Sequence, residues 1–334
     1  MSISNKLSRY EIENIYSAAN SSIWHSHNFA NINAKNKVRE EDFVAALVSN
    51  GIPILTQRCI SILQPKGVFL RISGVFCHGH PRVKFGNNNP IELADLLIVH
   101  QHIGLTRSSG RALLIQAKMS DDSTHRLPSG DTQLKLFSTW PPFKFITGGL
   151  PTQLRNIDEK GKGSRYALVL NDHSYPEDIT WADQCPWSTC EAKQILTSDI
   201  SLAKIIGNML LGKEGRAFEL TNKKNEWSQL IHDLLTITGE RTYTRNNISI
   251  NNMSRLTGIE SRAPGMMFLS ASHNYTSLPE HFINKTLTER FFTNKPSYNN
   301  SSDTPSEEIN REQPEGGIST IIIETIDIEK INKR

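Results

Sequence analysis

Cysteine and long apolar runs are scarce in this sequence, and the scarcity excludes several classes of protein. The chain has only four Cys in 334 residues. They lack the spacing of a disulfide framework, which excludes a small disulfide-stabilised secreted domain and fits a reducing cytosol. No apolar run reaches the roughly 18 residues of a membrane-spanning helix, and residues 1–7 lack the apolar core of a signal peptide. We therefore expect a cytoplasmic protein with no membrane segment.

Several motifs that hold nucleotides or zinc are also absent. No G-x-G-x-x-G follows a predicted strand, and no G-x-x-x-x-G-K-[ST] loop is present, so neither a dinucleotide fold nor a P-loop is expected. The sequence has no H-E-x-x-H pattern and no internal repeats. Any chemistry must therefore come from other residues.

The composition fits a soluble globular protein with a real core. Hydrophobic residues make up 37% of the chain and charged residues 21%, and the length suggests one large or two modest domains. The formal net charge of +3 is unevenly distributed. Residues 1–150 hold 16 Lys and Arg against 10 Asp and Glu, whereas residues 151–334 hold 21 against 24. The basic half suits a polyanionic partner without requiring one.

Apolar periodicity predicts a mixed α/β fold. Helical spacing occurs in six segments: 8–24, 38–49, 54–64, 131–138, 198–211 and 225–238. Strands are predicted at 67–76, 83–85, 90–99, 111–119, 165–170, 266–269 and 318–328, and residues 20–37, rich in Asn, Ser and His, predict a loop. Because helices and strands do not alternate regularly, we expect a mixed sheet flanked by helices and not a doubly wound fold.

The same pattern predicts four regions along the chain. Residues 1–175 form an α/β core, and residues 176–294 form an accessory, mainly helical region. Residues 295–317 are rich in Ser, Asn, Pro, Glu and Gly and predict a flexible linker. Residues 318–334 then predict a C-terminal strand, which must pair with something. It either returns to the sheet of its own chain or adds to the sheet of a partner protein or second copy.

Two predicted strands, 90–99 and 111–119, carry polar residues that are unusual in buried strands. Asp95 interrupts the first, and Gln116 and Lys118 close the second. Because side chains alternate between faces, Gln116 and Lys118 share a face, and Asp95 joins them if the strands form a hairpin. Phosphodiester cleavage requires such groups: a carboxylate that holds Mg²⁺, a metal that activates water, and a Lys that stabilises developing negative charge.

This arrangement resembles the PD-(D/E)XK nuclease superfamily, in particular its QxK variant among Mrr-like and RecB-like enzymes. The matching residues are Asp95 within Glu-Leu-Ala-Asp and the Gln-Ala-Lys that ends at Lys118. The helix that contains Glu41 resembles one that often supplies a further acid in that superfamily. The helix that contains Gln133 resembles the Gln-containing helix after the last motif strand. The resemblance covers about residues 38–140 and implies a restriction-endonuclease-like core.

The resemblance also implies a role for each matching residue. Asp95 would be the principal ligand of Mg²⁺ or Mn²⁺, assisted by Glu41 and Gln116, and Lys118 would be the catalytic Lys. Contacts to nucleic acid would come from Gln133 and from basic residues of the N-terminal half: Lys84, Arg111, Lys135, Arg71, Arg82 and Arg107. The implied function is a Mg²⁺-dependent endonuclease that hydrolyses phosphodiester bonds of DNA, in restriction or antiphage defence.

Simpler explanations stay open for each of these residues. Asp95 could form a salt bridge or lie at an exposed strand end. Lys118 could mark the point where its strand meets solvent, and Gln133 could be a solvated helix residue. Glu40 is the alternative to Glu41, because acids in a first helical turn are expected from the helix dipole alone.

Gln116 carries the main alternative function. A neutral amide is a weaker ligand for a hard cation than the carboxylate usual at that position. The chain could therefore be a catalytically inactive nuclease-like module that binds nucleic acid or a partner protein.

A zinc site is the remaining metal hypothesis. Its candidate ligands are Cys77, His78, His80, Cys185 and Cys190. Their spacing provides no second matched pair of ligands, so we expect buried thiols and loop histidines instead.

Overall fold

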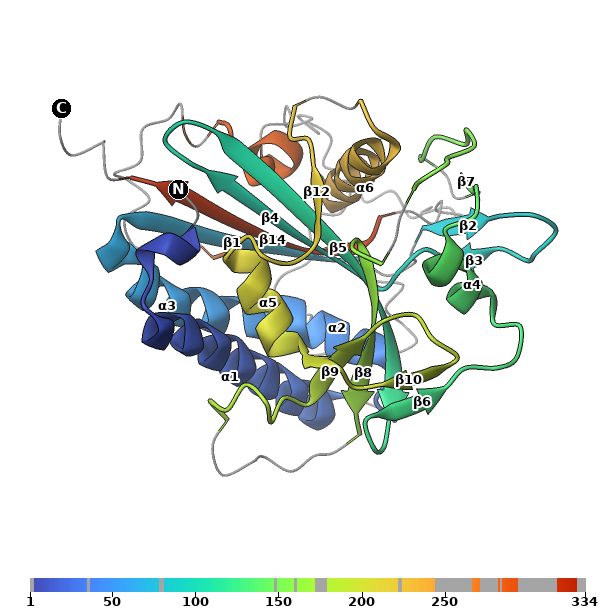
Figure 1. Ribbon diagram of the computed structural model, residues 1–334, viewed down its shortest axis with the longest axis horizontal. Coiled ribbons are helices and arrows are strands. Elements are labelled where there is room, and N and C mark those ends of the chain that lie inside the picture. Colours follow the sequence, from blue (N-terminus) through green and yellow to red (C-terminus); the bar gives the residue numbers. More distant parts are fainter. Residues whose placement is uncertain are drawn as a thin grey trace, which may run out of the picture.

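One large mixed β-sheet with helices on both faces organises the chain (Figure 1). The computed structural model describes residues 3–34, 37–77, 81–146, 149–158, 161–171, 179–221, 224–243, 266–270, 282, 284–293 and 317–328. The sheet has nine strands: β1 (Val68–Phe76), β4 (Leu96–Ile103), β5 (Ser108–Ser120), β8 (Ser164–Leu170), β9 (Trp187–Cys190), β11 (Ile200–Ser201), β12 (Arg216–Phe218), β13 (Met266–Ser270) and β14 (Ser319–Asp327). The predicted α/β class with a mixed, helix-flanked sheet is confirmed.

The order across the sheet is β11-β9-β8-β5-β4-β14-β1-β13, and β12 pairs with β5 outside this path. β4 and β5 form the predicted antiparallel hairpin, with Leu96 opposite Ile115 at one end and Ile103 opposite Ser108 at the other. β5 runs parallel to β8, and β14 runs parallel to β4 and antiparallel to β1. Two small sheets lie beside the main one: β6 (Thr124–Arg126) pairs with β10 (Ile195–Thr197), and β2 (Arg82–Lys84) pairs with β3 (Ile91–Glu92) and β7 (Lys144–Phe145).

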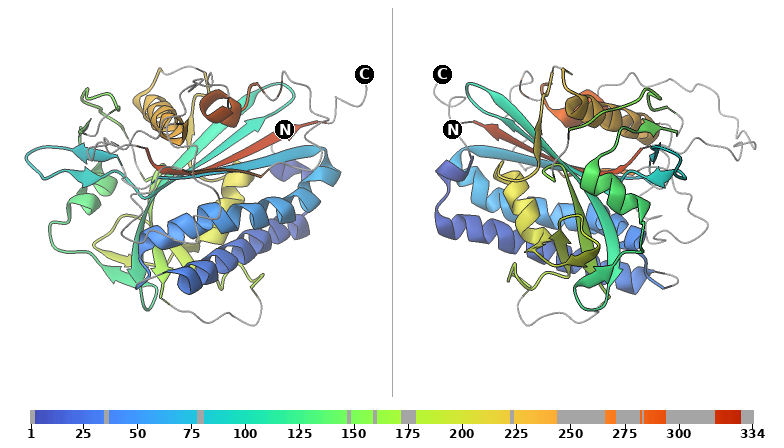
Figure 2. Two further views of the ribbon diagram at one scale, coloured as in Figure 1. Left: turned by 180° about the vertical axis from the view of Figure 1, so that it is seen from behind. Right: turned by 45° about the vertical axis from the view of Figure 1, so that its right-hand side comes forward.

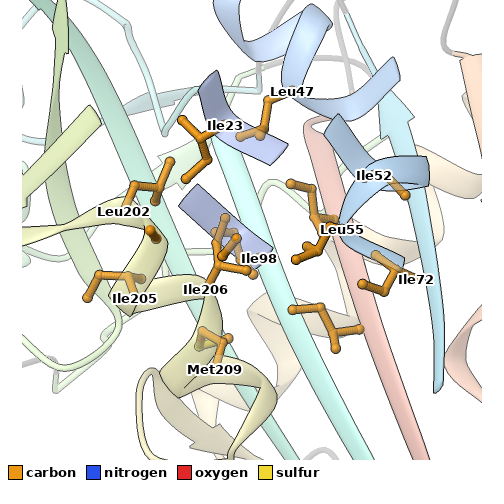
Figure 3. Packing of buried hydrophobic residues seen from close by; sticks show 14 of the residues in the cluster. Ile23, Leu47, Ile52, Leu55, Ile72, Ile98, Leu202, Ile205, Ile206 and Met209 are labelled. Atoms are coloured by element: carbon orange, nitrogen blue, oxygen red, sulfur yellow. The ribbon is translucent and has the colours of Figure 1, made fainter. Parts of the chain in front are cut away.

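One face of the sheet is covered by the N-terminal helices and α5, as both views in Figure 2 show. These elements are η1 (Ile3–Lys6), α1 (Arg9–Asn33), α2 (Glu40–Ala46), the π-helical turn η2 (Leu47–Gly51), α3 (Ile52–Leu63), η3 (Gln64–Lys66) and α5 (Leu202–Leu210). Their apolar side chains meet those of β1 and β4, for example Ile23 and Ile206 with Ile98 (Figure 3). This layer is the first of two hydrophobic cores.

The opposite face is covered by α4 (Thr132–Thr139), α6 (Glu226–Tyr243) and η6 (Glu289–Thr293). Its core is rich in large rings, with Trp140 edge-on to Trp227 and stacked on Phe137. The predicted helix 131–138 is therefore present as α4, and its apolar face holds it against the sheet.

The helices α2, η2, α3 and η3 form one continuous stretch, although Gly51 and Pro53 predict a stop. The N–H of Ile52 donates to the carbonyl of Leu47, five residues back, so a π-helical turn carries the chain into the next helix. Pro53 then sits in the first turn of α3, where its missing N–H is not needed. The stretch Glu40–Lys66 is long and apolar enough to cross a membrane, with a mean hydropathy of 1.3, but 61% of that window is buried inside the fold, as in a core helix of a soluble protein.

The loop predicted at residues 20–37 is wrong for residues 20–33, which continue α1. Five of its polar residues are buried in the fold instead of facing water: Asn20, Ser21, Ser22, Ser26 and His27. The start of the segment bonds to residues 179–184. The amide of Asn20 donates to the carbonyls of Ile179 and Trp181, both at 2.7 Å, and the indole N–H of Trp24 donates to the carbonyl of Gln184 at 2.6 Å. Tertiary hydrogen bonds therefore stabilise a helix that composition alone does not predict.

The predicted C-terminal strand, β14, lies inside the sheet of its own chain. It pairs with β4 on one side and β1 on the other, and all nine of its residues are buried. Its edges are therefore not available to a partner protein or second copy. Residues 176–294, predicted as an accessory helical region, likewise add β9, β11, β12 and β13 to this sheet, so the sheet shows no boundary at residue 175. The predicted linker lies outside the described residues, apart from Gly317.

Candidate functional site

Asp95 lies immediately before β4, in a local irregularity of the hairpin. The strand predicted at 90–99 is divided here into β3 and β4. The N–H of Asp95 donates to the carbonyl of Ile115 at 2.9 Å, while Leu96 is the residue paired with Ile115 in the ladder. Two residues thus face one, as in a β-bulge, a feature that redirects side chains near active sites. Asp95 can therefore turn its carboxylate toward the end of β5.

The Asp95 carboxylate contacts the predicted partner strand directly. Its Oδ2 accepts hydrogen bonds from Nε2 of Gln116 at 2.5 Å and from the backbone N–H of Ala117 at 2.6 Å. Both side chains are almost fully buried, with exposed fractions of 6% for Asp95 and 5% for Gln116. The carboxylate thus caps the strand where regular pairing with β4 stops, and the predicted proximity of Asp95 and Gln116 is present.

Lys118 follows two residues after Gln116 and shares its face by strand alternation. The side chain is half-buried. Within the described residues it makes no hydrogen bond or ion pair. Its ammonium is therefore available to a bound anion.

Glu40, and not Glu41, reaches the end of β5. The Oε1 of Glu40 accepts a hydrogen bond from the backbone N–H of Met119 at 3.2 Å. Glu41 instead pairs with Arg39 at 2.8 Å, near the surface of the helix. The first acid of α2 therefore occupies the place that the sequence assigned to the second, and the alternative kept open for Glu40 is the arrangement in the structure.

Asp95 and Glu40 cap the same edge of β5. In an extended strand the N–H groups of Ala117 and Met119 leave the same side, and the carbonyl of Ala117 leaves that side between them. One carboxylate accepts from each N–H. Two carboxylates thus flank a backbone carbonyl at the strand end.

Gln133 of α4 points back to the same place. Its Nε2 donates to the carbonyl of Leu93, two residues before Asp95, at 3.2 Å. Asp131 is the N-cap of this helix. Its side chain accepts a hydrogen bond from the N–H of Leu134 at 2.7 Å and so fixes the first turn. The structure therefore brings Gln133 to the site as a positioning group for the chain around Asp95.

Tyr166 of β8 is a residue at the site that the sequence did not single out. It lies beside Gln116 in the parallel ladder, and its side chain belongs to the same face of the sheet. Its hydroxyl is buried and has no hydrogen-bond partner in the part of the chain that the structure describes. Burial, followed by the charges of Asp131, Cys190 and Asp95, raises the pKa of Tyr166 above its usual range, so the hydroxyl keeps its proton. Only the strand register reveals this neighbour.

The predicted basic contacts are spread over the molecule. Lys135 is exposed on α4 near the site, and Lys84 is half-buried on β2 opposite Lys144. Arg111 lies seven residues before Lys118 on β5, about 23 Å away along a strand, and donates to the carbonyl of Gly215 at 2.7 Å.

Arg71, also predicted to contact phosphate, is buried in the core. Its guanidinium pairs with Glu324 of β14 at 2.5 Å and with Glu289 at 2.9 Å. A guanidinium that is paired and only 3% exposed cannot reach a nucleic acid, so this prediction is wrong.

The oxygens at the end of β5 fit a hard divalent cation. Asp95 and Glu40 supply carboxylates, and the buried Oε1 of Gln116 has no hydrogen-bond partner among the residues that the structure describes. Mg²⁺ is commonly held by one or two carboxylates together with substrate phosphates and water, so this donor set suffices. It contains no soft ligand, and among the described residues no three His, Cys, Asp or Glu side chains group to hold a metal by themselves.

The structure does not support the zinc hypothesis. All four cysteines are free thiols, and Cys77 and Cys190 are buried. Burial raises the pKa of Cys190 to about 11 and of Cys185 to about 12, which disfavours the thiolate that zinc needs. His78 and His80 lie outside the described residues.

No family model, curated protein or solved structure matches this chain. What the arrangement can do chemically follows from its donors. It combines two acids, an amide oxygen and Lys118, which has no ion-pair partner among the described residues, at the end of one strand. Such a set can hold a divalent cation and a phosphate side by side.

Proposed function

We propose that this protein is a Mg²⁺-dependent nuclease whose centre lies at the end of β5. The observation that carries the proposal is the pair of carboxylates, Asp95 and Glu40, bonded to the N–H groups of Ala117 and Met119 on one strand edge. Lys118 follows on the same short segment. The PD-(D/E)XK resemblance of the sequence, with Gln at the second motif position, supports the same function.

Each residue has a role that follows from its chemistry. Asp95 and Glu40 would hold the cation, with the amide oxygen of Gln116 and the carbonyl of Ala117 as neutral donors. When bound, the cation would neutralise the phosphate and lower the pKa of a coordinated water. Lys118 would place its ammonium against the phosphate and stabilise negative charge that develops during cleavage.

The remaining contacts position these groups. Gln116 donates to Asp95 and so fixes the orientation of the carboxylate. Gln133 holds the backbone just before Asp95 through the carbonyl of Leu93. Because the acids are bonded to strand atoms and not to loops, their separation is set by the sheet.

DNA is the proposed substrate, and the cytoplasm is the proposed compartment. The basic first 150 residues suit a polyanion, and exposed Lys135 lies on α4, the helix that also carries Gln133. A role in restriction or antiphage defence is part of the same proposal and rests on the resemblance of the sequence.

Cleavage of nucleic acid tests this function directly. Purified protein is incubated with supercoiled plasmid, linear duplex DNA and RNA in the presence of Mg²⁺, Mn²⁺ or EDTA. We expect the protein to cleave DNA and EDTA to abolish the cleavage. Asp95→Asn and Lys118→Met should each reduce the cleavage rate at least about a hundredfold. Intact DNA and RNA under every condition, or cleavage that both variants retain, would sink the proposal.

The second candidate is a nuclease-like module without catalytic activity. It is favoured by one observation: the site has an amide, Gln116, where an acid would bind a cation more tightly. Under this alternative the protein binds duplex DNA without cleaving it, and Asp95→Asn leaves the affinity unchanged. A Gln116→Glu variant separates the two, because restored cleavage in an inactive protein would identify Gln116 as the cause.

A further inference from the structure

Two neighbouring residues on the candidate site's face of the sheet each have a buried polar atom without a hydrogen-bond partner among the described residues. One is Oε1 of Gln116 on β5, and the other is the hydroxyl of Tyr166 on β8. The two residues are direct partners in the parallel ladder, so their side chains leave neighbouring strands on the same face. The exposed fractions are 5% for Gln116 and 0% for Tyr166. Buried groups of this kind are usually hydrogen-bonded, so this pair requires an explanation.

The surroundings of Tyr166 hold its ring in place and leave the hydroxyl unused. The ring meets Phe137 of α4 edge-on, with 5.5 Å between centroids. A purely structural position here would suit Phe, because the ring fills the aromatic core while an unpaired hydroxyl costs free energy. The presence of Tyr therefore points to a use for its O–H group.

Hydrogen-bond accounting for Gln116 indicates what that use is. The amide nitrogen already donates to Asp95, so the oxygen is the part of the amide that lacks a partner among the described residues. An amide oxygen has two lone pairs, and a cation occupies one of them. The second lone pair can accept a hydrogen bond, and the neighbouring Tyr166 has a hydroxyl that can donate one.

We propose that Tyr166 is the outer-shell partner of Gln116. The two groups are not hydrogen-bonded to each other in the structure. When the divalent cation binds, the Tyr166 hydroxyl would donate a hydrogen bond to the amide oxygen and hold that oxygen in place as a ligand. This inference rests on the proposed function and deepens it. A chain of hydrogen bonds would then connect Tyr166 to Gln116 and Gln116 to Asp95, and each group would orient the next. A neutral Gln supported from both sides is a better ligand than an isolated amide, since outer-shell hydrogen bonds tune metal affinity.

Tyr166→Phe removes the hydroxyl and keeps the ring. We expect the affinity for Mn²⁺, measured by calorimetric titration of the full chain, to fall about 10- to 100-fold, the usual effect of losing an outer-shell partner. The melting temperature in EDTA is expected to stay the same or rise, because the variant removes an unpaired buried group. If the hydroxyl had a purely structural role, Tyr166→Phe would lower the melting temperature and leave the Mn²⁺ affinity unchanged.

Tyr16→Phe is the matched control. The hydroxyl of Tyr16 donates to Oδ1 of Asn208 at 2.7 Å, on the opposite face of the sheet. The same chemical change there should lower the melting temperature and leave Mn²⁺ affinity unaltered. Asp95→Asn is the second control and should abolish specific Mn²⁺ binding.

A double-mutant cycle tests whether Tyr166 acts through Gln116. In a Gln116→Leu background, adding Tyr166→Phe should not weaken Mn²⁺ binding further. A further loss in that background, unchanged Mn²⁺ affinity in the single Tyr166→Phe variant, or loss of its cooperative unfolding would each overturn the inference. If instead the wild-type chain binds no Mn²⁺ in an Asp95-dependent manner, the proposed function fails as well, so the two failures are distinguishable.

Discussion

Glu40 and Asp95 accept hydrogen bonds from backbone N–H groups that are two residues apart on the same edge of β5. Glu40 comes from a helix and bonds to Met119 at 3.2 Å, and Asp95 comes from the bulge before β4 and bonds to Ala117 at 2.6 Å. The sheet therefore sets the separation of the two acids. This relationship is the observation on which the proposed cation site rests.

The choice between the two acids of α2 gives the first prediction. Glu40→Gln should reduce Mg²⁺-dependent DNA cleavage at least about tenfold, because it removes a charged donor from the strand end. Glu41→Gln should leave cleavage within about twofold of wild type, since Glu41 forms only a partly exposed pair with Arg39. Both rates are measured at several Mg²⁺ concentrations. Equal loss of cleavage in both variants would contradict a specific role of Glu40. Loss only in Glu41→Gln would show that α2 presents Glu41 to the site.

The buried Arg71 supports the fold and not the site. Arg71→Ala would leave Glu324, which is 0% exposed, without its ion-pair partner. We expect the free energy of unfolding to fall by about 3–5 kcal/mol, measured by urea denaturation. DNA affinity per folded molecule should not change. A stable Arg71→Ala protein with weakened DNA binding would restore the original prediction of a phosphate contact.

His100 makes stability depend on pH. Burial, followed by the charges of His102 and Arg111, lowers the pKa of His100 from 6.5 to about 3. In the unfolded chain His100 takes up a proton below about pH 6.5, and in the folded chain it does not, so protons favour unfolding. Stability should therefore fall by up to about 1.4 kcal/mol for each pH unit below 6.5, until the pH approaches 3.

A His100→Gln variant tests this linkage. Urea unfolding of the wild type and the variant is compared at pH 7 and pH 5. The wild type should lose about 2 kcal/mol more than the variant over this range. An identical loss in both proteins would mean that His100 is not the group that binds the proton.

Removal of β14 tests the role assigned to the C-terminal strand. A chain that ends at residue 316 loses the strand between β1 and β4, together with nine buried residues. We expect no cooperative thermal transition and an insoluble product, in contrast to a chain that ends at residue 328. A soluble, folded truncated protein that fails only to bind a partner would indicate that the strand serves an interaction instead.

The sequence was sufficient to locate several of the longer elements of this fold. Alternating or apolar runs located β1, β5, β8 and β14, and helical spacing located α3, α4 and α6. The residues of the candidate site could be predicted only in part from the sequence. Strand alternation placed Gln116 with Lys118, and the hairpin brought Asp95 to Gln116.

The remaining features depend on contacts between distant parts of the chain. Whether Glu40 or Glu41 faces β5 depends on how α2 docks, which a helical wheel does not specify. The polar second half of α1 is buried by tertiary contacts, among them the hydrogen bonds that Asn20 and Trp24 donate to residues 179–184. Tyr166 joins the site only through the pairing of β5 with β8, and nothing in its own segment marks it.

The most direct test of the central claim is the position of Mn²⁺ in crystals of this protein. Anomalous scattering from Mn²⁺ locates the ion independently of activity. The account predicts one strong peak within coordination distance, about 2.0–2.6 Å, of carboxylate oxygens of Asp95 and Glu40, and no such peak in Asp95→Asn crystals. A peak elsewhere, or none at the end of β5 at saturating Mn²⁺, would contradict it.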